Sequence, residues 1–197
     1  MYITRERLNR IVDSLPPQAV TEQHTFSSVG ADATIFLSHK HLERNILFQV
    51  KALFESLGMK VYVDWMERNM QHPTNAETAK ELKKQIDEQD KFILIATDAA
   101  INAPWCNWEI GLADRSKSDQ DKIAILPIAD TSGRWNHNEY LQIYPSIEYE
   151  NGTGLTVSGT KIAAGYYVFY PADSKGNRHF VTLTKWLKQG MPQVRFL

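Results

Sequence analysis

The residues best suited to chemistry lie together in one short segment, Pro104-Trp105-Cys106-Asn107-Trp108-Glu109. Asn102-Ala103 followed by this proline predicts a helix start, and the helix is expected to run to about residue 116. Residues four apart share a helix face, so Trp105 and Glu109 should form an aromatic plate beside a carboxylate. The structural alternative is that both tryptophans are core residues and Glu109 is a solvated surface acid.

Polar residues also follow each predicted strand of the chain. Short apolar runs predict strands over residues 33–38, 60–64, 91–97 and 122–127, and they alternate with helical patterns, which favours a parallel sheet. Ligands of such sheets bind at the carboxyl ends of the strands. The residues expected at that edge are Ser38-His39-Lys40, Asp64-Trp65, Thr97-Asp98 and Ala129-Asp130.

Apolar spacing predicts the helices between these strands. Leu42, Ile46, Val50, Leu53 and Leu57 recur every three or four residues, and Gly58 follows as a C-cap. Thr74-Asn75-Ala76-Glu77 has the form of a capping box that opens the next helix. We therefore predict an α/β, flavodoxin-like, doubly wound parallel sheet of about five strands in the order 2-1-3-4-5, with helices on both faces.

Both ends of the chain are less regular than its centre. Residues 1–32 are predicted as a leading helix over 3–15 and a loop, residues 33–130 as the core, and residues 131–197 as the part that completes the domain. In that last part, residues 165–170 should be the fifth strand and Asn151-Gly152 a tight turn, while Phe180, Leu183 and Leu187 mark a closing helix.

Composition excludes several classes of function. The 197 residues carry 22 Lys and Arg against 23 Asp and Glu, which gives no overall attraction to nucleic acid or anionic lipid. Cys106 is the single cysteine, so no intrachain disulfide can form and a reducing cytoplasm is expected. No apolar run approaches the roughly 20 residues of a spanning helix. We expect a cytoplasmic protein with neither nucleic-acid nor membrane partners.

Three weaker candidates have competing interpretations. His39-x-His41 resembles a metal pair, but no further ligand follows at suitable spacing, so no metal is predicted. Cys106 would need a neighbouring base to act as a nucleophile, and a small buried thiol is favoured. Lys40, Arg44 and Arg68 are placed either to meet a diphosphate or simply to be solvated.

The chain from about residue 33 to residue 130 resembles a TIR (Toll/interleukin-1 receptor) domain. Ile35-Phe36-Leu37-Ser38-His39 is similar to the family's first box, and residues 58–64 are similar to its second strand with a terminal acid. The most specific likeness is Trp105-Cys106-Asn107-Trp108-Glu109, which matches the family's Trp-Cys-x-x-Glu signature. One departure is that Pro73 precedes Thr74, where the family usually has a Pro-Gly pair.

The resemblance implies either an enzyme that cleaves NAD+ at the nicotinamide–ribose bond or a non-catalytic scaffold for homotypic contacts. The enzymes have Glu at the position of Glu109, which favours the first. Ordinary glycoside hydrolysis needs two carboxylates, whereas nicotinamide leaves as a neutral molecule, so one acid suffices. The resemblance thus implies a catalytic Glu109, with Trp105 stacking on a dinucleotide ring and Ser38 and Asp64 shaping the ribose pocket. The other residues expected to bind NAD+ are His39, Lys40, Trp65 and Arg68.

Two other kinds of protein share features with this chain, and one of them, the response-regulator receiver, shares the doubly wound layout. A response-regulator receiver needs an acidic pair after the first strand, where this chain has Ser38-His39-Lys40, so it is set aside. A nucleoside deoxyribosyltransferase also places a Glu over a ribose, and incubation with NAD+ against deoxynucleosides separates the two.

The resemblance also carries biological expectations. Small single-domain proteins of this kind act in bacterial antiviral defence, where NAD+ is the substrate and no cofactor is required. The products are nicotinamide and ADP-ribose, or a cyclic or conjugated form of it that signals to a separate effector. Family members often self-associate through TIR–TIR contacts to complete their active site, so an oligomer is expected.

Overall fold

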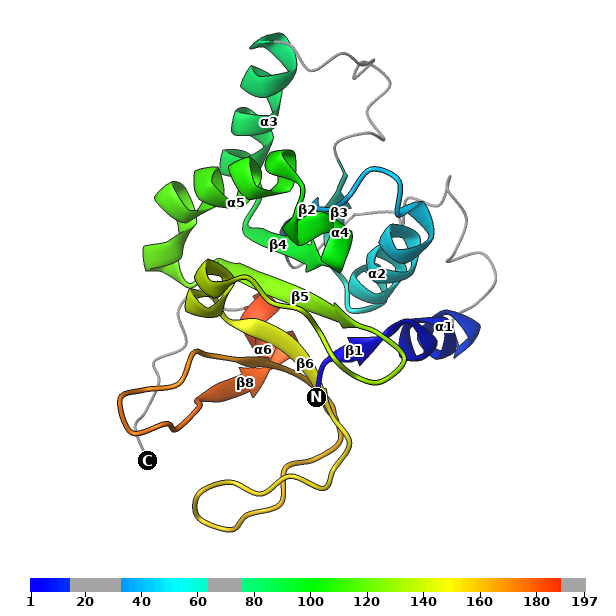
Figure 1. The fold of residues 1–197 in the computed structure, drawn as a ribbon, viewed down its shortest axis with the longest axis vertical. Helices are drawn as coiled ribbons and strands as arrows, with labels where there is room; N and C mark the ends of the chain where they lie inside the picture. Colours follow the sequence, from blue (N-terminus) through cyan, green and yellow to red (C-terminus); the bar gives the residue numbers. More distant parts are fainter. Residues whose placement is uncertain (15–32, 64–75, 189–197) are drawn as a thin grey trace.

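A computed structural model describes residues 1–14, 33–63 and 76–188 (Figure 1). The strands are β1 (Ile3–Thr4), β2 (Thr34–Ser38), β3 (Lys60–Tyr62), β4 (Lys91–Ala96), β5 (Ile123–Ala129), β6 (Ser146–Glu150), β7 (Gly165–Phe169) and β8 (Phe180–Thr182). The helices are α1 (Arg5–Ser14), α2 (Arg44–Ser56), α3 (Ala76–Glu88), α4 (Asp98–Ile101), α5 (Pro104–Lys117) and α6 (Leu183–Lys188), with 3-10 turns η3 (Ser118–Gln120) and η4 (Glu139–Ile143). None of these helices is long and apolar enough to cross a membrane.

The strands form one mixed sheet in the order β3-β2-β4-β5-β6-β7-β8, and β1 pairs with β5. Strands β3, β2, β4 and β5 are parallel, with Ile35 beside Val61 and Ile93 beside Ala124. This half reproduces the predicted 2-1-3-4 order, and the α/β doubly wound class is confirmed.

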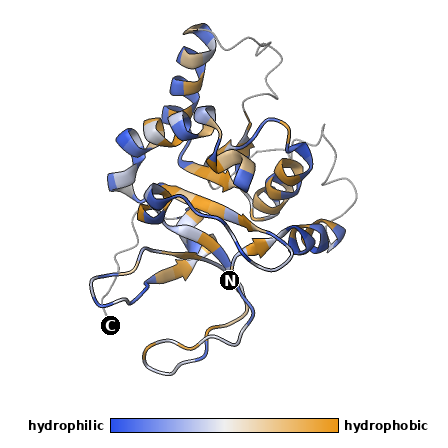
Figure 2. Ribbon diagram, viewed as in Figure 1, coloured by the Kyte–Doolittle hydropathy of each residue, from blue (hydrophilic) through white to orange (hydrophobic). Residues whose placement is uncertain are grey.

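Alternating side chains divide the sheet between two apolar layers. Odd-numbered residues of β2, such as Ile35 and Leu37, pack with α1, α2 and α6, whereas Phe36 packs with α3 and α5. Because neighbouring side chains of a strand point to opposite faces, one run of apolar residues supplies both layers. The apolar strands lie at the centre of the molecule, between helices with polar outer faces (Figure 2).

The predicted helix ends are partly confirmed. Gly58 has φ of 86° directly after α2, which is the left-handed conformation expected of a C-cap glycine. Pro104 is the first residue of α5, but Ala103 is the N-cap, and Asn102 instead ends the unpredicted short helix α4. Thr74 of the predicted capping box lies outside the described residues.

The predicted fifth strand was wrong in place and direction. The strand beside β5 is β6, and residues 165–169 form β7, which runs antiparallel to β6. Residues 151–164 form a long connection, which begins with a bend at Gly152, where φ is 87° and the Glu150 carboxylate accepts hydrogen bonds from the N–H groups of Gly152, Thr153 and Gly154. The two terminal helices begin later than predicted. Ile3 of the predicted first helix belongs to β1, and Phe180 of the predicted closing helix belongs to β8.

Lys91 should make stability depend on pH. Its side chain is buried, its Nζ donates to the Asp121 carbonyl at 3.2 Å, and burial lowers its pKa to about 8. Between that value and 10.5 the unfolded chain binds more protons than the folded one, so stability should rise with pH. The free energy of unfolding should increase by about 1–2 kcal/mol from pH 7.5 to pH 9.5. The Trp186 ring, whose centroid lies 4.2 Å from Nζ, favours the charged form of Lys91 and so limits the lowering of its pKa.

The measurement is urea denaturation across that pH range, with Lys91→Met as the comparison. The variant should show a smaller rise, and the part that remains is assigned to Lys117, whose pKa is also lowered by burial. Burial raises the pKa of Tyr144 and Tyr170, so these groups reduce stability only at higher pH. An identical slope in wild type and variant would contradict the assignment.

Candidate active site

A buried contact between β2 and α5 lies at the carboxyl edge of the sheet. The Ser38 hydroxyl donates to the Glu109 carboxylate across 2.5 Å, and the two residues are 1% and 2% exposed. Glu109 is therefore not the solvated surface acid of the structural alternative. A carboxylate at this depth requires partners, and Ser38 is one of them.

Strand alternation explains why these two side chains meet. Phe36 points to the face that α5 covers, so Ser38, two residues further along β2, points the same way. Helix α5 lies on that face through buried Cys106, Ile110 and Ala113. Glu109 is one position before Ile110 and three after Cys106, so the same helical stripe directs its carboxylate toward the end of β2.

Cys106 makes the second contact between this helix and the strand end. Its thiol donates to the backbone carbonyl of His39 at 3.3 Å, and both residues are buried. The thiol is thus a small buried group that joins the first turn of α5 to the segment after β2. The His39 ring stacks with that of His41, with centroids 6.1 Å apart.

Trp105 is partly buried at the start of α5. Its ring stacks on that of Trp108 with a centroid distance of 4.8 Å, and both rings pack against the apolar layer below. Both tryptophans contribute to the core, as the structural alternative predicts, but part of Trp105 stays accessible, as a ligand-stacking ring requires. Trp108 also has the Lys83 ammonium 5.7 Å from its ring.

The segment after β5 forms hydrogen bonds with the end of β4, the end of α4 and the first turn of α5. The Trp135 indole N–H donates to the Ala96 carbonyl at the end of β4, 2.6 Å away. The Asn138 amide donates to the Ile101 carbonyl, and the Tyr140 hydroxyl donates to the Asn107 side chain. Sequence reasoning missed these positioning residues, because nothing in the spacing of residues 131–145 indicates where they pack.

A second carboxylate missed by sequence reasoning lies at the same edge. Glu43, just before α2, accepts a hydrogen bond from the Thr97 hydroxyl and lies 3.4 Å from the Arg5 guanidinium. Thr97 is also the N-cap of α4 and accepts the Ala100 N–H. Sequence reasoning could have found Glu43, because it directly precedes the helix α2 and the N-terminus of a helix favours negative charge.

The remaining predicted residues are only partly described. Lys40 is partly buried, and its carbonyl accepts the Glu43 N–H in the turn after β2. Asp64, Trp65 and Arg68 lie outside the described residues. Across residues 1–14, 33–63 and 76–188, no three His, Cys, Asp or Glu side chains gather as metal ligands would.

Ser38→Ala should lower turnover at this site by about tenfold to a hundredfold, since a hydrogen bond to a charged group contributes about 1.5–3 kcal/mol. The measurement is the rate of product formation from NAD+, the substrate implied by the sequence resemblance. Cys106→Ser is the matched control, because it keeps a donor for the His39 carbonyl and leaves the Glu109 contact intact. Unchanged turnover in Ser38→Ala would remove the role assigned to this hydroxyl.

The sequence of this chain matches one family model and one curated protein. The family model for the TIR domain matches residues 35–153, from β2 to the connection after β6. A curated protein from Bacillus cereus (strain MSX-D12), "Probable 3' cyclic ADP-D-ribose synthase ThsB'", is 28% identical over 159 residues, which cover 79% of this chain and 75% of that protein. With more than half of the chain matched by the family model, the protein belongs to the TIR domain family.

Proposed function

We propose that this protein cleaves NAD+ at the nicotinamide–ribose bond. The observation that carries the proposal is the buried Glu109 carboxylate, held by the Ser38 hydroxyl at the carboxyl edge of the parallel strands. This edge is where sheets of this class bind ligands. The family match and the related synthase add support from independent sequence comparison.

The reaction suits one acid. As the bond between C1′ of the ribose and the pyridinium nitrogen breaks, its electron pair neutralises that nitrogen and nicotinamide leaves without needing a proton. Positive charge then develops on C1′ and the ring oxygen, and a fixed carboxylate nearby stabilises it. Glu109 supplies this charge, and Ser38 orients its carboxylate.

The other proposed roles follow from position. The exposed portion of Trp105 stacks on a ring of the dinucleotide, next to the carboxylate one helical turn away. His39 and Lys40 follow Ser38 directly and border the same site, where the Lys40 side chain meets the diphosphate. We assign Asp64, Trp65 and Arg68 to NAD+ binding from the sequence alone.

The product depends on which nucleophile captures the ribosyl cation. Water gives ADP-ribose and releases a proton, whereas a group of the ADP-ribose moiety itself gives a cyclic product. The relative's name specifies a cyclic ADP-D-ribose synthase, which favours cyclisation here. We further propose a cytoplasmic enzyme of bacterial antiviral defence, which self-associates through TIR–TIR contacts and whose product acts on a separate effector.

The test is incubation of concentrated purified protein with NAD+, with nicotinamide measured by chromatography and the other product by mass spectrometry. A cyclic product has the mass of ADP-ribose less one water, so one spectrum separates hydrolysis from cyclisation. A parallel incubation with deoxynucleosides tests base exchange. Absence of nicotinamide at all protein concentrations would overturn the proposal and leave a scaffold as the role of the domain.

A further inference from the structure

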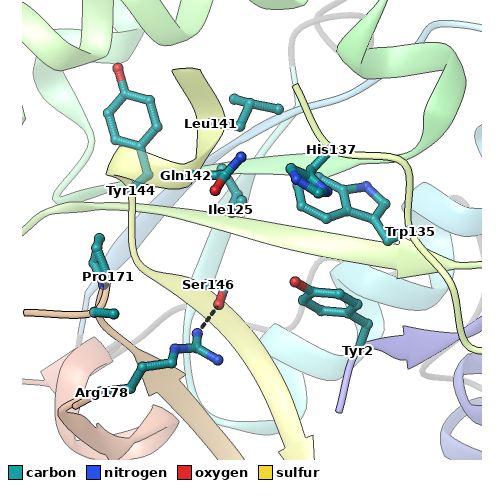
Figure 3. A pocket seen from close by; sticks show the side chains of 11 residues that line it. Tyr2, Ile125, Trp135, His137, Leu141, Gln142, Tyr144, Ser146, Pro171 and Arg178 are labelled. Carbon is teal, nitrogen blue, oxygen red and sulfur yellow. Dashed lines mark hydrogen bonds between the residues drawn. The ribbon is translucent and has the colours of Figure 1, made fainter. Parts of the chain in front are cut away.

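A pocket separate from the Glu109 site lies on the same side of the sheet as α5. Its volume is about 290 Å³, and its lining comes from Tyr2, β5, residues 135–144, the first residue of β6 and residues 171–178 (Figure 3). Neither Ser38 nor Glu109 lines it. The volume equals that of about ten water molecules, which is enough for one substituted ring.

One wall of the pocket is aromatic and firmly held. Trp135 is 8% exposed, and its indole N–H is bound to the Ala96 carbonyl. The Tyr2 ring meets it edge to face, with centroids 5.4 Å apart, and the His137 ring lies 5.9 Å away. Figure 3 shows these three rings grouped together. A fixed aromatic wall favours a planar ligand, because little ordering is needed on binding.

Arg178 faces this wall from the other side of the pocket. Its Nε donates to the Tyr170 carbonyl, and its Nη2 donates to Ser146 at 3.0 Å and to Glu148 at 2.8 Å. The guanidinium also lies 4.9 Å from the Phe169 ring centroid. No residue of the described ranges accepts a hydrogen bond from Nη1. The guanidinium is thus held in position with two donors left for a ligand.

The positive charges near Arg178 exceed the negative ones, which favours binding of an anion. Glu148 is buried, and its second oxygen lies 3.4 Å from the Met1 nitrogen, so one carboxylate is shared between two cations. The Tyr2 hydroxyl points toward the Ser146 side of the pocket (Figure 3). Burial and nearby Glu148 raise the pKa of Tyr2, so its hydroxyl remains a donor.

We propose that this pocket binds a small planar aromatic ring that bears one carboxylate or phosphate. The ring lies against Trp135 and His137, and the anionic group accepts hydrogen bonds from Arg178 Nη1 and the Tyr2 hydroxyl. A hydrogen bond from a guanidinium N–H to an oxyanion is stronger than one to a neutral amide. The site therefore selects for charge as well as for shape.

The test uses benzoate, phenyl phosphate and benzamide, the last being a neutral isostere of benzoate. Titrations follow the indole N–H resonances of the five tryptophans by NMR, with the Trp135 signal identified by its loss in Trp135→Phe. One of the two anions should shift the Trp135 signal saturably, and benzamide should bind at least about tenfold more weakly. The better anion identifies carboxylate or phosphate as the preferred group.

Ala172→Phe should weaken that binding by at least about tenfold, because Ala172 lines the pocket, is exposed and can be enlarged without loss of packing. Ala163→Phe enlarges an exposed alanine that does not line the pocket, and it should bind normally. Glu109→Gln should also bind normally, which separates this site from the proposed NAD+ site. Any of three results would overturn the proposal. They are equal affinity for benzoate and benzamide, shifts confined to Trp105 and Trp108, and no saturable shift up to about 10 mM ligand.

Discussion

Glu109→Gln should reduce nicotinamide release from NAD+ by about a hundredfold to a thousandfold, the loss typical when a preorganised electrostatic contact is removed. The amide has the size of the carboxylate, and its oxygen can still accept the Ser38 hydroxyl. The substitution removes the negative charge and little else. Initial rates at saturating NAD+ measure the effect, because the charge acts on the transition state more than on binding.

Two controls belong with this variant. Glu88→Gln removes another glutamate charge at an exposed position paired with Lys84, and it should keep wild-type activity. Circular dichroism and the melting temperature of Glu109→Gln should match those of the wild type, since a neutral amide is easier to bury than a carboxylate. Full turnover in a folded Glu109→Gln protein would refute the catalytic role and with it the proposed mechanism.

Trp186→Ala should reduce the free energy of unfolding by about 3–5 kcal/mol, the usual cost of deleting a fully buried large aromatic side chain. Trp186 is 0% exposed in α6 and packs in the layer that also contains α1 and α2. Its ring also lies 4.2 Å from Lys91 Nζ. Urea denaturation at pH 7 measures the change through the transition midpoint.

Trp186→Phe is the matched comparison. The indole N–H is buried and has no hydrogen-bond partner within the described part of the chain, so phenylalanine deletes no hydrogen bond there. Phenylalanine also keeps an aromatic ring beside Lys91. Its substitution should reduce the free energy of unfolding by about half as much as alanine does, or less, because it leaves a smaller cavity. A loss below about 1 kcal/mol for Trp186→Ala would show that α6 contributes little to the core.

The first four strands of the sheet could be predicted because their signals are local. Runs such as Phe92–Ile95 are apolar at every position, as strands covered on both faces must be. The stripe of α2 has helical spacing, and all but two of its five predicted apolar positions are buried, Leu42 being exposed and Leu57 half-buried. Right-handed crossovers then determine the order of these strands.

Residues 165–170 are predicted as a strand and 165–169 form β7, but the pairing of the remaining strands could not be predicted, because it joins segments far apart in the chain. β1 has two residues, Ile3 and Thr4, and it is a strand because it lies beside Ile128 and Ala129 of β5. β6 has the alternation of a strand, with Ser146, Glu148 and Glu150 on one face, but its place between β5 and β7 is known only from the structure. Without β5 beside it, the two-residue β1 is too short to be recognised as a strand.

For the site, the sequence alone determined which residue to test and what chemistry to expect, because the Trp-Cys-x-x-Glu signature and helical spacing are properties of neighbouring residues. Only the tertiary structure decided that Glu109 is buried against Ser38, that the Cys106 thiol binds the His39 carbonyl, and that Trp135 and Arg178 face one pocket. These contacts join residues about 40 to 70 positions apart, and their geometry depends on strand register and helix packing, which no local pattern encodes.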